Sequence, residues 1–342
     1  MLEPCRALER QGYEVTYLQP GRDGTIAPEA VAAALREDTV LVSMMLVNNE
    51  TGCIFPVAET AQLLRDRKSH ALLHCDAVQG FLKVPCEPEV WGVDMMSLSA
   101  HKLGGPKGVG ALYISERFRN VRPLLPGGGQ ERGLRSGTQN VAGAVALAIG
   151  LNESNARMQA QYRELVASRD MLIDAVRRVA PRADLTGDPE RRLPGHASFI
   201  FPGVTGEALL VDLDARGIAA SSGSACAIGR HEIPATLLAM GLEPSIAKSA
   251  LRMTFRKPLT REQVERISLA IEESYTDLTA IKSDATYQKG NDVAPPLQRN
   301  PRSSPATSAS TGCPSTRRTA NSSSPPASAG HSTPWTSASS PS

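Results

Sequence analysis

The chain has no long uninterrupted apolar stretch, and this absence excludes one class of protein at the outset. No segment of the 342 residues approaches the roughly 20 consecutive apolar residues that a membrane-spanning helix needs. The first residues, MLEPCRALERQG, contain neither the basic nor the apolar region of a secretory leader. We therefore expect a cytoplasmic protein that does not associate with a membrane.

The sequence also lacks closely spaced cysteines and a surplus of one charge. Its six cysteines are scattered, without a CxxC pair that would suggest zinc and without the dense spacing of a secreted disulfide framework. Lys and Arg number 37 against 35 for Asp and Glu, so no global field attracts nucleic acid or an anionic membrane. A small-molecule substrate is the better starting hypothesis.

Short apolar runs alternate with helical patterns over the first half of the chain. The patterns predict strands over residues 13–18, 39–47, 71–75, 93–98 and 109–114, and helices over 28–37 and 56–66. Such alternation is typical of an α/β layer with a largely parallel sheet. Later patterns predict a smaller α+β domain, with a helix over 152–180, a strand near 197–201, and helices near 206–216, 232–240 and 260–281.

Polar residues close three of the predicted strands, at the ends where parallel sheets bind ligands. They are Asn48, Asn49 and Glu50 after the second strand, Asp76 after the third, and Ser99, His101 and Lys102 after the fourth. Pyridoxal phosphate (PLP) requires such a set, because a lysine forms its Schiff base and an aspartate keeps its pyridine nitrogen protonated. Ser99 and His101 would donate to the phosphate. Since an isolated strand-end lysine is more often a surface charge, the pattern alone leaves both interpretations open.

Four motifs together carry a resemblance to a known family. They are HCDAVQ (74–79), SLSAHKLGGPKGVGALY (97–113), GGGQERGLRSGTQNVAG (127–143) and SSGSACAIG (221–229). In this order they closely resemble the cysteine desulfurases of the NifS/IscS type, which belong to the class V aminotransferases. The resemblance runs from residue 1 to about residue 281. It implies the aspartate-aminotransferase-like PLP fold type I, with a large α/β domain and a small α+β C-terminal domain.

The resemblance also assigns roles to single residues. It implies PLP on Lys102, Asp76 at the pyridine nitrogen, Asn49 and Gln79 near the ring hydroxyl, and Ser99 and His101 at the phosphate. Thr138 would reach the phosphate of a partner subunit, which implies a homodimer. Arg252 would bind the α-carboxylate of the substrate, where a planar bidentate fork suits the geometry, and Asn49 would also contact the substrate. Without the motifs, an arginine in a strand is more often part of a structural ion pair.

Cys226 lies in a run of small residues with two glycines, which suits a nucleophile that must move. The other cysteines of the globular part, Cys5, Cys53, Cys75 and Cys86, are interpreted as small hydrophobic residues. The resemblance implies that L-cysteine becomes L-alanine while its sulfur forms a persulfide on Cys226, with His101 a candidate proton acceptor. The sulfur acceptor would be an iron–sulfur scaffold or a tRNA-thiolation enzyme.

Two parts of the family pattern do not occur in the sequence. The glycine- and threonine-containing phosphate loop and the histidine that stacks on the PLP ring have no match in the 342 residues. We therefore expect an N-terminally truncated desulfurase with a partial PLP-binding domain (1–155), a small domain with the cysteine loop (156–282), and a disordered Ser/Pro-rich tail (283–342). We hypothesise that this tail is an out-of-frame extension. The alternatives are an inactive fragment or binding module, a selenocysteine lyase, or a class V aminotransferase.

Overall fold

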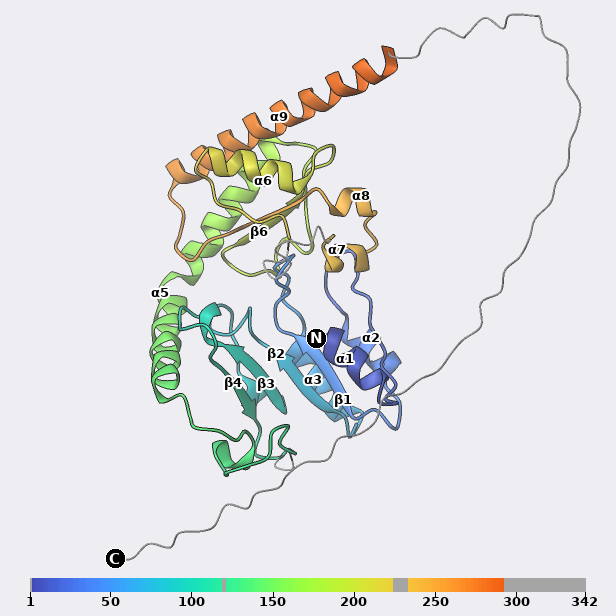
Figure 1. Cartoon of the computed structure of the whole chain (residues 1–342), viewed down its shortest axis with the longest axis vertical. Helices are drawn as coiled ribbons and strands as arrows, with labels where there is room; N and C mark the ends of the chain where they lie inside the picture. Colours follow the sequence, from blue (N-terminus) through green and yellow to red (C-terminus); the bar gives the residue numbers. More distant parts are fainter. Residues whose placement is uncertain (1, 119–120, 224–232, 292–342) are drawn as a thin grey trace, which may run out of the picture. The chain divides into compact units, whose positions relative to one another are not determined.

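Figure 1 shows the computed structural model of the chain, which describes residues 2–118, 121–223 and 233–291. Side chains are described through residue 281. Two predicted features therefore lie outside the described residues: Cys226, and the part of the tail that follows residue 291.

The first half of the described chain forms a four-stranded sheet whose strands follow one another in sequence order. Its members are β1 (Leu41–Met45), β2 (Leu72–Asp76), β3 (Met95–Ser99) and β4 (Gly110–Ile114). The first three strands run parallel, and β4 pairs antiparallel with β3. The predicted α/β class with a mainly parallel sheet is confirmed, and the carboxyl ends of three neighbouring strands meet at one edge.

The strand predicted over residues 13–18 is wrong. This segment pairs with no strand of the described chain, and its Tyr13 and Tyr17 side chains are 55% and 40% exposed. Alternating apolar residues form a strand only where a neighbour supplies hydrogen bonds and a surface to cover one face. The sequence pattern carries no information on whether such a neighbour is present.

Helices connect the parallel strands and cover their core. The helices of this half are α1 (Leu2–Glu9), α2 (Pro28–Ala34), α3 (Val57–Asp66), α4 (Pro88–Trp91) and the 3-10 turns η1 (Ala100–Lys102) and η2 (Glu131–Gly133). In α3 the buried residues Val57, Ala61 and Leu64 recur at helical spacing, so one face of the helix is apolar. These side chains belong to one hydrophobic cluster with residues of β1, β2 and β3. The helix predicted over 56–66 is confirmed, whereas the one predicted over 28–37 ends at Ala34 because Leu35 adopts an extended conformation.

A three-stranded antiparallel sheet forms in the second half of the described chain. Its strands, in sheet order, are β5 (Asp184–Leu185), β6 (His196–Ile200) and β7 (Ala250–Thr254). All five residues of β6 are buried. Phe201 packs between Phe199 and Tyr275, with ring centroids 6.0 and 5.5 Å away. The Tyr275 hydroxyl donates to the Pro202 carbonyl at 2.6 Å. The Tyr275 ring is therefore buried in this core with its hydroxyl hydrogen-bonded.

The helices of this half surround that sheet. They are α5 (Val141–Val179), α6 (Gly206–Ala215), α7 (Ala235–Ala239), α8 (Pro244–Ala247) and α9 (Arg261–Asn291). In Figure 1 the long α9 runs beside α6, and α9 also contacts α5. The C-terminal part of α5, α6 and α9 share one hydrophobic cluster with β6 and β7.

The long helix α5 begins earlier than predicted. It starts at Val141, because Asn140 caps it by accepting a hydrogen bond from the Gly143 N–H at 3.0 Å. The predicted domain boundary at residue 155 thus falls inside α5. The two sheets have separate hydrophobic clusters, whereas the point of division between domains stays a prediction.

Candidate functional site

Three of the predicted site residues lie at the carboxyl ends of adjoining strands. Asp76 is the last residue of β2, Ser99 is the last residue of β3, and Lys102 ends the η1 turn that follows β3. The register of the parallel pair places Asp76 opposite Ser97. The fold therefore brings a carboxylate, a hydroxyl and an amine to one edge of the sheet, as the sequence predicts.

The Asp76 carboxylate is held in place but keeps hydrogen-bonding capacity. Its Oδ1 accepts from the Val78 N–H at 3.1 Å, and its backbone carbonyl accepts from the Leu46 N–H at 2.9 Å. Within the described residues no donor is recorded for Oδ2. The residue is half-buried. Such a carboxylate can accept one further hydrogen bond from a bound molecule.

Ser99 and His101 form a pair. The Ser99 hydroxyl and the His101 Nδ1 are 2.8 Å apart and hydrogen-bonded. His101 is exposed, whereas Ser99 is half-buried. One group donates to the other in this bond, and the pair keeps a donor that suits an anionic ligand group.

The turn that carries Lys102 is anchored on both sides. Ala100 is fully buried, and Leu103 is only 3% exposed. The Leu103 carbonyl accepts from the Ser154 hydroxyl of α5 at 2.8 Å. Gly104 has a φ of +90°, a left-handed conformation that favours glycine. These contacts fix the backbone on both sides of Lys102, which is half-buried, so the side chain of this lysine extends from a fixed Cα position.

Lys83 is a residue of this region that the sequence analysis missed. Its pKa is lowered to about 8, first because its amine is buried and then because Lys102 and Arg256 carry like charges nearby. Arg256 also approaches the lysine turn, since its Nη2 donates to the Leu103 carbonyl at 3.4 Å. Three cations thus gather around the turn and favour an anionic ligand there. No motif contains Lys83 or Arg256, so only the fold could reveal the cluster.

Arg252 connects the second sheet to the end of β1. From β7, its Nη1 donates to the Asn49 carbonyl at 2.6 Å and its Nη2 donates to the Ser221 hydroxyl at 3.1 Å. Burial lowers the pKa of Arg252, whereas nearby Glu50 raises it. The structure therefore brings the Arg252 side chain to the backbone of Asn49, and two acceptors orient the guanidinium. Within the described residues no ion pair between Arg252 and a carboxylate is present.

The described residues on either side of Cys226 lie beside Arg252. Ser221, Gly223 and Pro234 line the same narrow cavity as Arg252. The Ser221 hydroxyl donates to the Gly223 carbonyl at 2.9 Å while it accepts from Arg252. Cys226 itself lies outside the described residues, so its role stays a prediction.

Two predicted residues have fewer contacts. Gln79 is half-buried in the turn after β2, and Thr138 is exposed in the loop before α5. Thr138 makes no hydrogen bond to the other predicted site residues in the part of the chain that the structure describes. The structure thus does not join it to the carboxyl edge of its own subunit.

The other described cysteines are unpaired and poorly placed for reaction. Cys53 and Cys75 are fully buried, and Cys5 and Cys86 are half-buried. Burial raises the pKa of Cys75 far above its ordinary value and raises the pKa of Cys86 to about 12. A thiol with a raised pKa is a poor nucleophile. Cys75 and Cys86 therefore behave as small hydrophobic residues, and complete burial gives Cys53 the same character, in agreement with the sequence interpretation.

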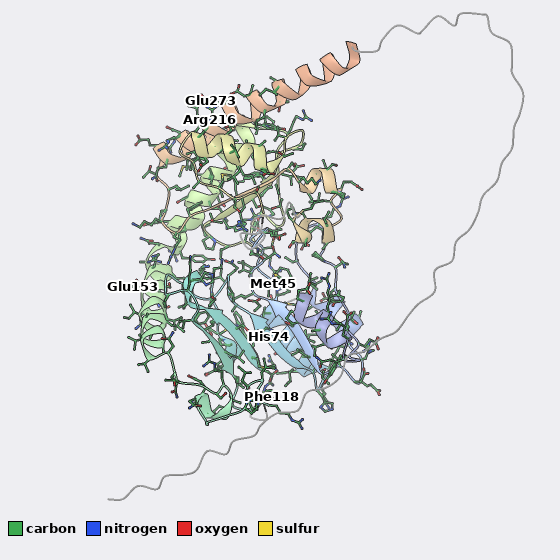
Figure 2. The ribbon with its side chains drawn as sticks, viewed as in Figure 1. Met45, His74, Phe118, Glu153, Arg216 and Glu273 are labelled. Carbon is green, nitrogen blue, oxygen red and sulfur yellow. The ribbon has the colours of Figure 1, made fainter. Side chains whose placement is uncertain are left out.

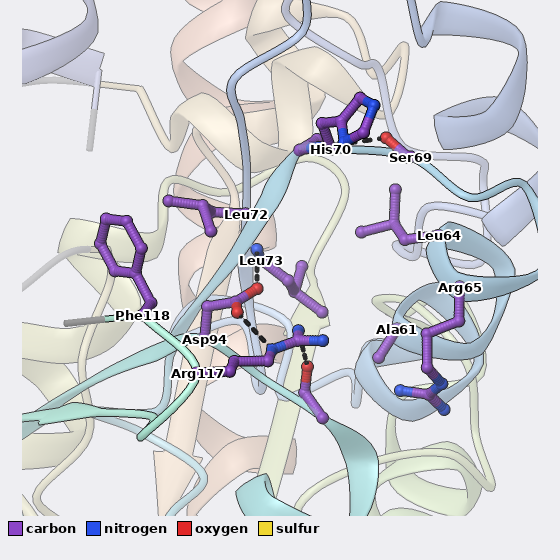
Figure 3. Close-up of a pocket in the computed structure, with 12 residues that line it drawn as sticks. Ala61, Leu64, Arg65, Ser69, His70, Leu72, Leu73, Asp94, Arg117 and Phe118 are labelled. Atoms are coloured by element: carbon purple, nitrogen blue, oxygen red, sulfur yellow. Dashed lines mark hydrogen bonds and ion pairs between the residues drawn. The ribbon is translucent and has the colours of Figure 1, made fainter. Parts of the chain in front are cut away.

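A cavity of about 220 Å³ opens at the opposite, amino, ends of the strands (Figure 3). Asp94 lines it and is 2% exposed. Its carboxylate accepts from the Leu73 N–H at 2.8 Å and from the Arg117 Nε at 2.7 Å, and Arg117 also donates to the Gly92 carbonyl at 2.7 Å. Because the Asp94 and Arg117 charges pair with each other, we interpret them as a structural ion pair. None of the predicted site residues lines this cavity.

Within residues 2–118, 121–223 and 233–291, no helix is long and apolar enough to cross a membrane. In the same ranges no group of three or more His, Cys, Asp or Glu could hold a metal ion.

Comparison with known proteins identifies the family. The model of the aminotransferase class-V family matches residues 1–267. The cysteine desulfurase IscS of Anaeromyxobacter dehalogenans is 42% identical over 267 residues, which are 78% of this chain and 65% of that relative. The cysteine desulfurase NifS of Azotobacter vinelandii is 38% identical over 291 residues, covering 85% of this chain and 71% of the relative.

A solved structure supports the same conclusion at the level of the fold. A NifS-like protein with 36% sequence identity superimposes with a TM-score of 0.72, covering 81% of this chain and 72% of that one. This likeness confirms the predicted PLP fold type I. The chain spans about two thirds, 65%, of the length of the IscS relative. The chain belongs to the class-V aminotransferase family, among the cysteine desulfurases of the IscS and NifS type.

Proposed function

We propose that this chain is a PLP-dependent cysteine desulfurase, which converts L-cysteine to L-alanine and transfers the sulfur to Cys226. One observation carries the proposal: Asp76, the Ser99–His101 pair and Lys102 converge at one edge of the sheet. The names of the two relatives, both cysteine desulfurases, support the same reaction.

The chemistry of the donor set fits PLP. The cofactor needs an amine for its aldehyde, an acceptor for its protonated pyridine nitrogen, and donors for its phosphate. Lys102 offers the amine, and Asp76 offers a carboxylate whose Oδ2 has no recorded donor in the described chain. Ser99 and His101 are hydrogen-bonded to each other at 2.8 Å, and the pair keeps a donor for the phosphate. Gln79 and Asn49 would contact the ring and its hydroxyl.

Each residue has a distinct task in this proposal. When bound, PLP supplies an aldehyde that captures amines and a ring that accepts electrons from the substrate Cα. Lys102 Nζ would hold the cofactor aldehyde, and its free amine would take a proton from the substrate Cα. Asp76 keeps the proton on the pyridine nitrogen. The Lys83 and Arg256 charges near Lys102 favour an anionic group of the bound molecule beside this amine.

Arg252 and Cys226 act on the substrate. The Arg252 guanidinium, oriented by the Asn49 carbonyl and the Ser221 hydroxyl, binds the α-carboxylate. The Cys226 thiolate attacks the substrate Sγ, so that an S–S bond forms and the substrate C–S bond breaks. The electron pair of that bond stays on carbon, and protonation yields alanine. His101 accepts the proton of the incoming thiol.

The sulfur then leaves for an acceptor. We assign this role to an iron–sulfur scaffold or a tRNA-thiolation enzyme, because a protein persulfide needs a thiol acceptor. A homodimer would place Thr138, which is exposed, at the cofactor phosphate of the partner subunit. We place the enzyme in the cytoplasm, and divide the chain into a PLP-binding domain (1–155), a small domain (156–282) and a tail (283–342).

The visible absorption spectrum of the purified chain with PLP tests this proposal. We expect a band from lysine-bound cofactor that changes when L-cysteine is added, with equal amounts of alanine and sulfide released in the presence of a reductant. A folded chain that binds no PLP would contradict the proposal and support the alternative of a non-catalytic fragment or binding module. A circular dichroism spectrum of the same sample distinguishes this outcome from unfolding.

A further inference from the structure

A chain of three polar side chains crosses the parallel strands just behind the carboxyl edge. The Ser43 hydroxyl of β1 is hydrogen-bonded to His74 Nδ1 of β2 at 2.9 Å. His74 Nε2 is hydrogen-bonded to the Ser97 hydroxyl of β3 at 2.8 Å. His74, labelled in Figure 2 near Met45, thus uses both ring nitrogens to join three neighbouring strands.

This chain borders Asp76 directly. His74 and Asp76 are two residues apart in β2, so they project from the same face of the sheet. Ser97, the hydrogen-bond partner of His74, is also the register partner of Asp76. On the β1 side, Met45 is the register partner of Asp76. Asp76 therefore lies between Met45 and Ser97, on the two strands that the His74 hydrogen bonds join to β2.

The protonation state of His74 matters for Asp76. Burial lowers the pKa of His74, whereas Asp76 raises it. The residues that face the ring from the neighbouring strands are Ser43, Met45 and Ser97, together with Met95, its register partner, and none of these carries a charge. Hydroxyl groups can donate or accept, so the two serines accommodate a neutral ring without an unpaired nitrogen.

We infer that His74 is a positioning residue for Asp76. Its two hydrogen bonds fix β1, β2 and β3 in register where Asp76 must meet the pyridine nitrogen, and its neutral ring adds no charge beside the Asp76 carboxylate. A positively charged ring would compete with the pyridinium for the same carboxylate. The part of this inference that concerns PLP rests on the proposed function. The electrostatic interaction between His74 and Asp76 does not require a cofactor.

The first experiment therefore uses the cofactor-free chain. The titration of His74 is followed by NMR in the wild type and in Asp76→Asn. We expect the pKa of His74 to fall in the variant, because the carboxylate that raises it has become neutral. In His74→Phe, the amide of Leu46, which donates to the Asp76 carbonyl at 2.9 Å, should exchange hydrogen faster. An unchanged histidine titration together with unchanged Leu46 exchange would overturn the inference, whatever the cofactor does.

The second experiment measures PLP binding. His74→Phe removes two hydrogen bonds that hold the register around Asp76 and should weaken PLP binding about tenfold. His74→Gln keeps one donor and one acceptor and should restore most of the affinity. His70→Phe, at an exposed histidine near the start of β2, is the matched control and should bind like the wild type. Equal PLP affinity in His74→Phe and the control would also contradict the inference.

The two experiments distinguish failure of the inference from failure of the proposed function. If the wild-type chain binds no PLP while the NMR coupling and the exchange effect are present, the proposed function fails and the positioning of Asp76 by His74 stands. Thermal unfolding of each variant shows whether loss of PLP affinity exceeds the loss of stability. A variant that binds PLP weakly only because it unfolds counts against the inference.

Discussion

Asp76 and Asp94 lie at opposite ends of the same sheet and differ in how their charge is satisfied. Asp94 precedes β3 at the amino edge, is 2% exposed, and accepts from a backbone N–H and from Arg117. Asp76 ends β2 at the carboxyl edge, is half-buried, and accepts from the Val78 N–H at one oxygen. Each aspartate lies at one end of a short, mainly apolar strand, Asp76 at the end of β2 and Asp94 before the start of β3.

The difference shows why a cavity does not identify a site. The cavity of about 220 Å³ lies beside Asp94, where the charges are already paired (Figure 3). The residues with free capacity, including Lys102 and Arg252, gather at the opposite edge. A structural carboxylate is saturated by its own protein, whereas a ligand-binding carboxylate keeps an acceptor available. The following predictions test this contrast, beginning with the largest effect.

The first prediction concerns the amine at the carboxyl edge. Lys102→Ala should abolish the covalent PLP adduct that borohydride traps, because the variant lacks the nucleophile that holds the aldehyde. Mass spectrometry of the reduced protein measures the adduct. Lys107→Ala, an exposed lysine in the same loop, is the control and should retain it. An undiminished adduct on Lys102→Ala would refute the assignment of this edge as the active site.

The second prediction compares the two aspartates directly. Asp94→Ala should lower the free energy of unfolding by about 2 kcal/mol, because the Leu73 N–H loses its buried acceptor and the exposed Arg117 loses a partner. Asp76→Asn should change stability by less than about 1 kcal/mol, since the amide oxygen can still accept from Val78. Denaturant unfolding measures both.

The comparison also predicts opposite effects on the cofactor. Asp76→Asn should weaken the PLP interaction and shift the absorption of the bound cofactor, whereas a folded Asp94 variant should bind PLP normally. Equal effects of the two substitutions on both stability and PLP affinity would show that the two edges do not differ as described.

The third prediction concerns the guanidinium of β7. Arg252→Lys should raise the KM for L-cysteine about tenfold with a smaller change in kcat, because a single ammonium replaces a bidentate fork. Steady-state release of alanine gives both constants. Arg261→Lys, an exposed arginine at the start of α9, is the control. A KM that stays at the wild-type value would remove Arg252 from the substrate site.

The fourth prediction concerns stability against pH. Because Lys83 has a pKa of about 8 in the folded chain and 10.5 ordinarily, the unfolded chain binds more protons between these values, and stability rises with pH through this window. Lys83→Met should therefore stabilise the protein at pH 7, by on the order of 1 kcal/mol, and this gain should shrink from pH 8 to 10.5. Thermal unfolding at several pH values measures it. A gain that does not depend on pH would mean that the Lys83 charge is not the cause, and Lys107→Met should give no gain.

Local patterns in the sequence determined most of the fold and the chemical identity of the site. The strands that end in Asp76 and Ser99, the helix α3 and the lysine turn all follow from apolar spacing and from glycine, which act over a few residues. The motifs around Lys102 and Asp76 determined the family. The segment 13–18 was the exception, because a strand depends on a partner that its own residues cannot specify.

Only the tertiary structure decided which distant residues act together. Arg252 meets the Asn49 carbonyl across 203 positions of sequence, and Ser43, His74 and Ser97 meet because three strands adopt one register. Lys83 joins Lys102 through burial, which no motif encodes. Sequence patterns report local geometry, whereas hydrogen bonds and charges between distant segments arise from how the folded elements pack, and this packing is what gives the carboxyl edge its unpaired groups.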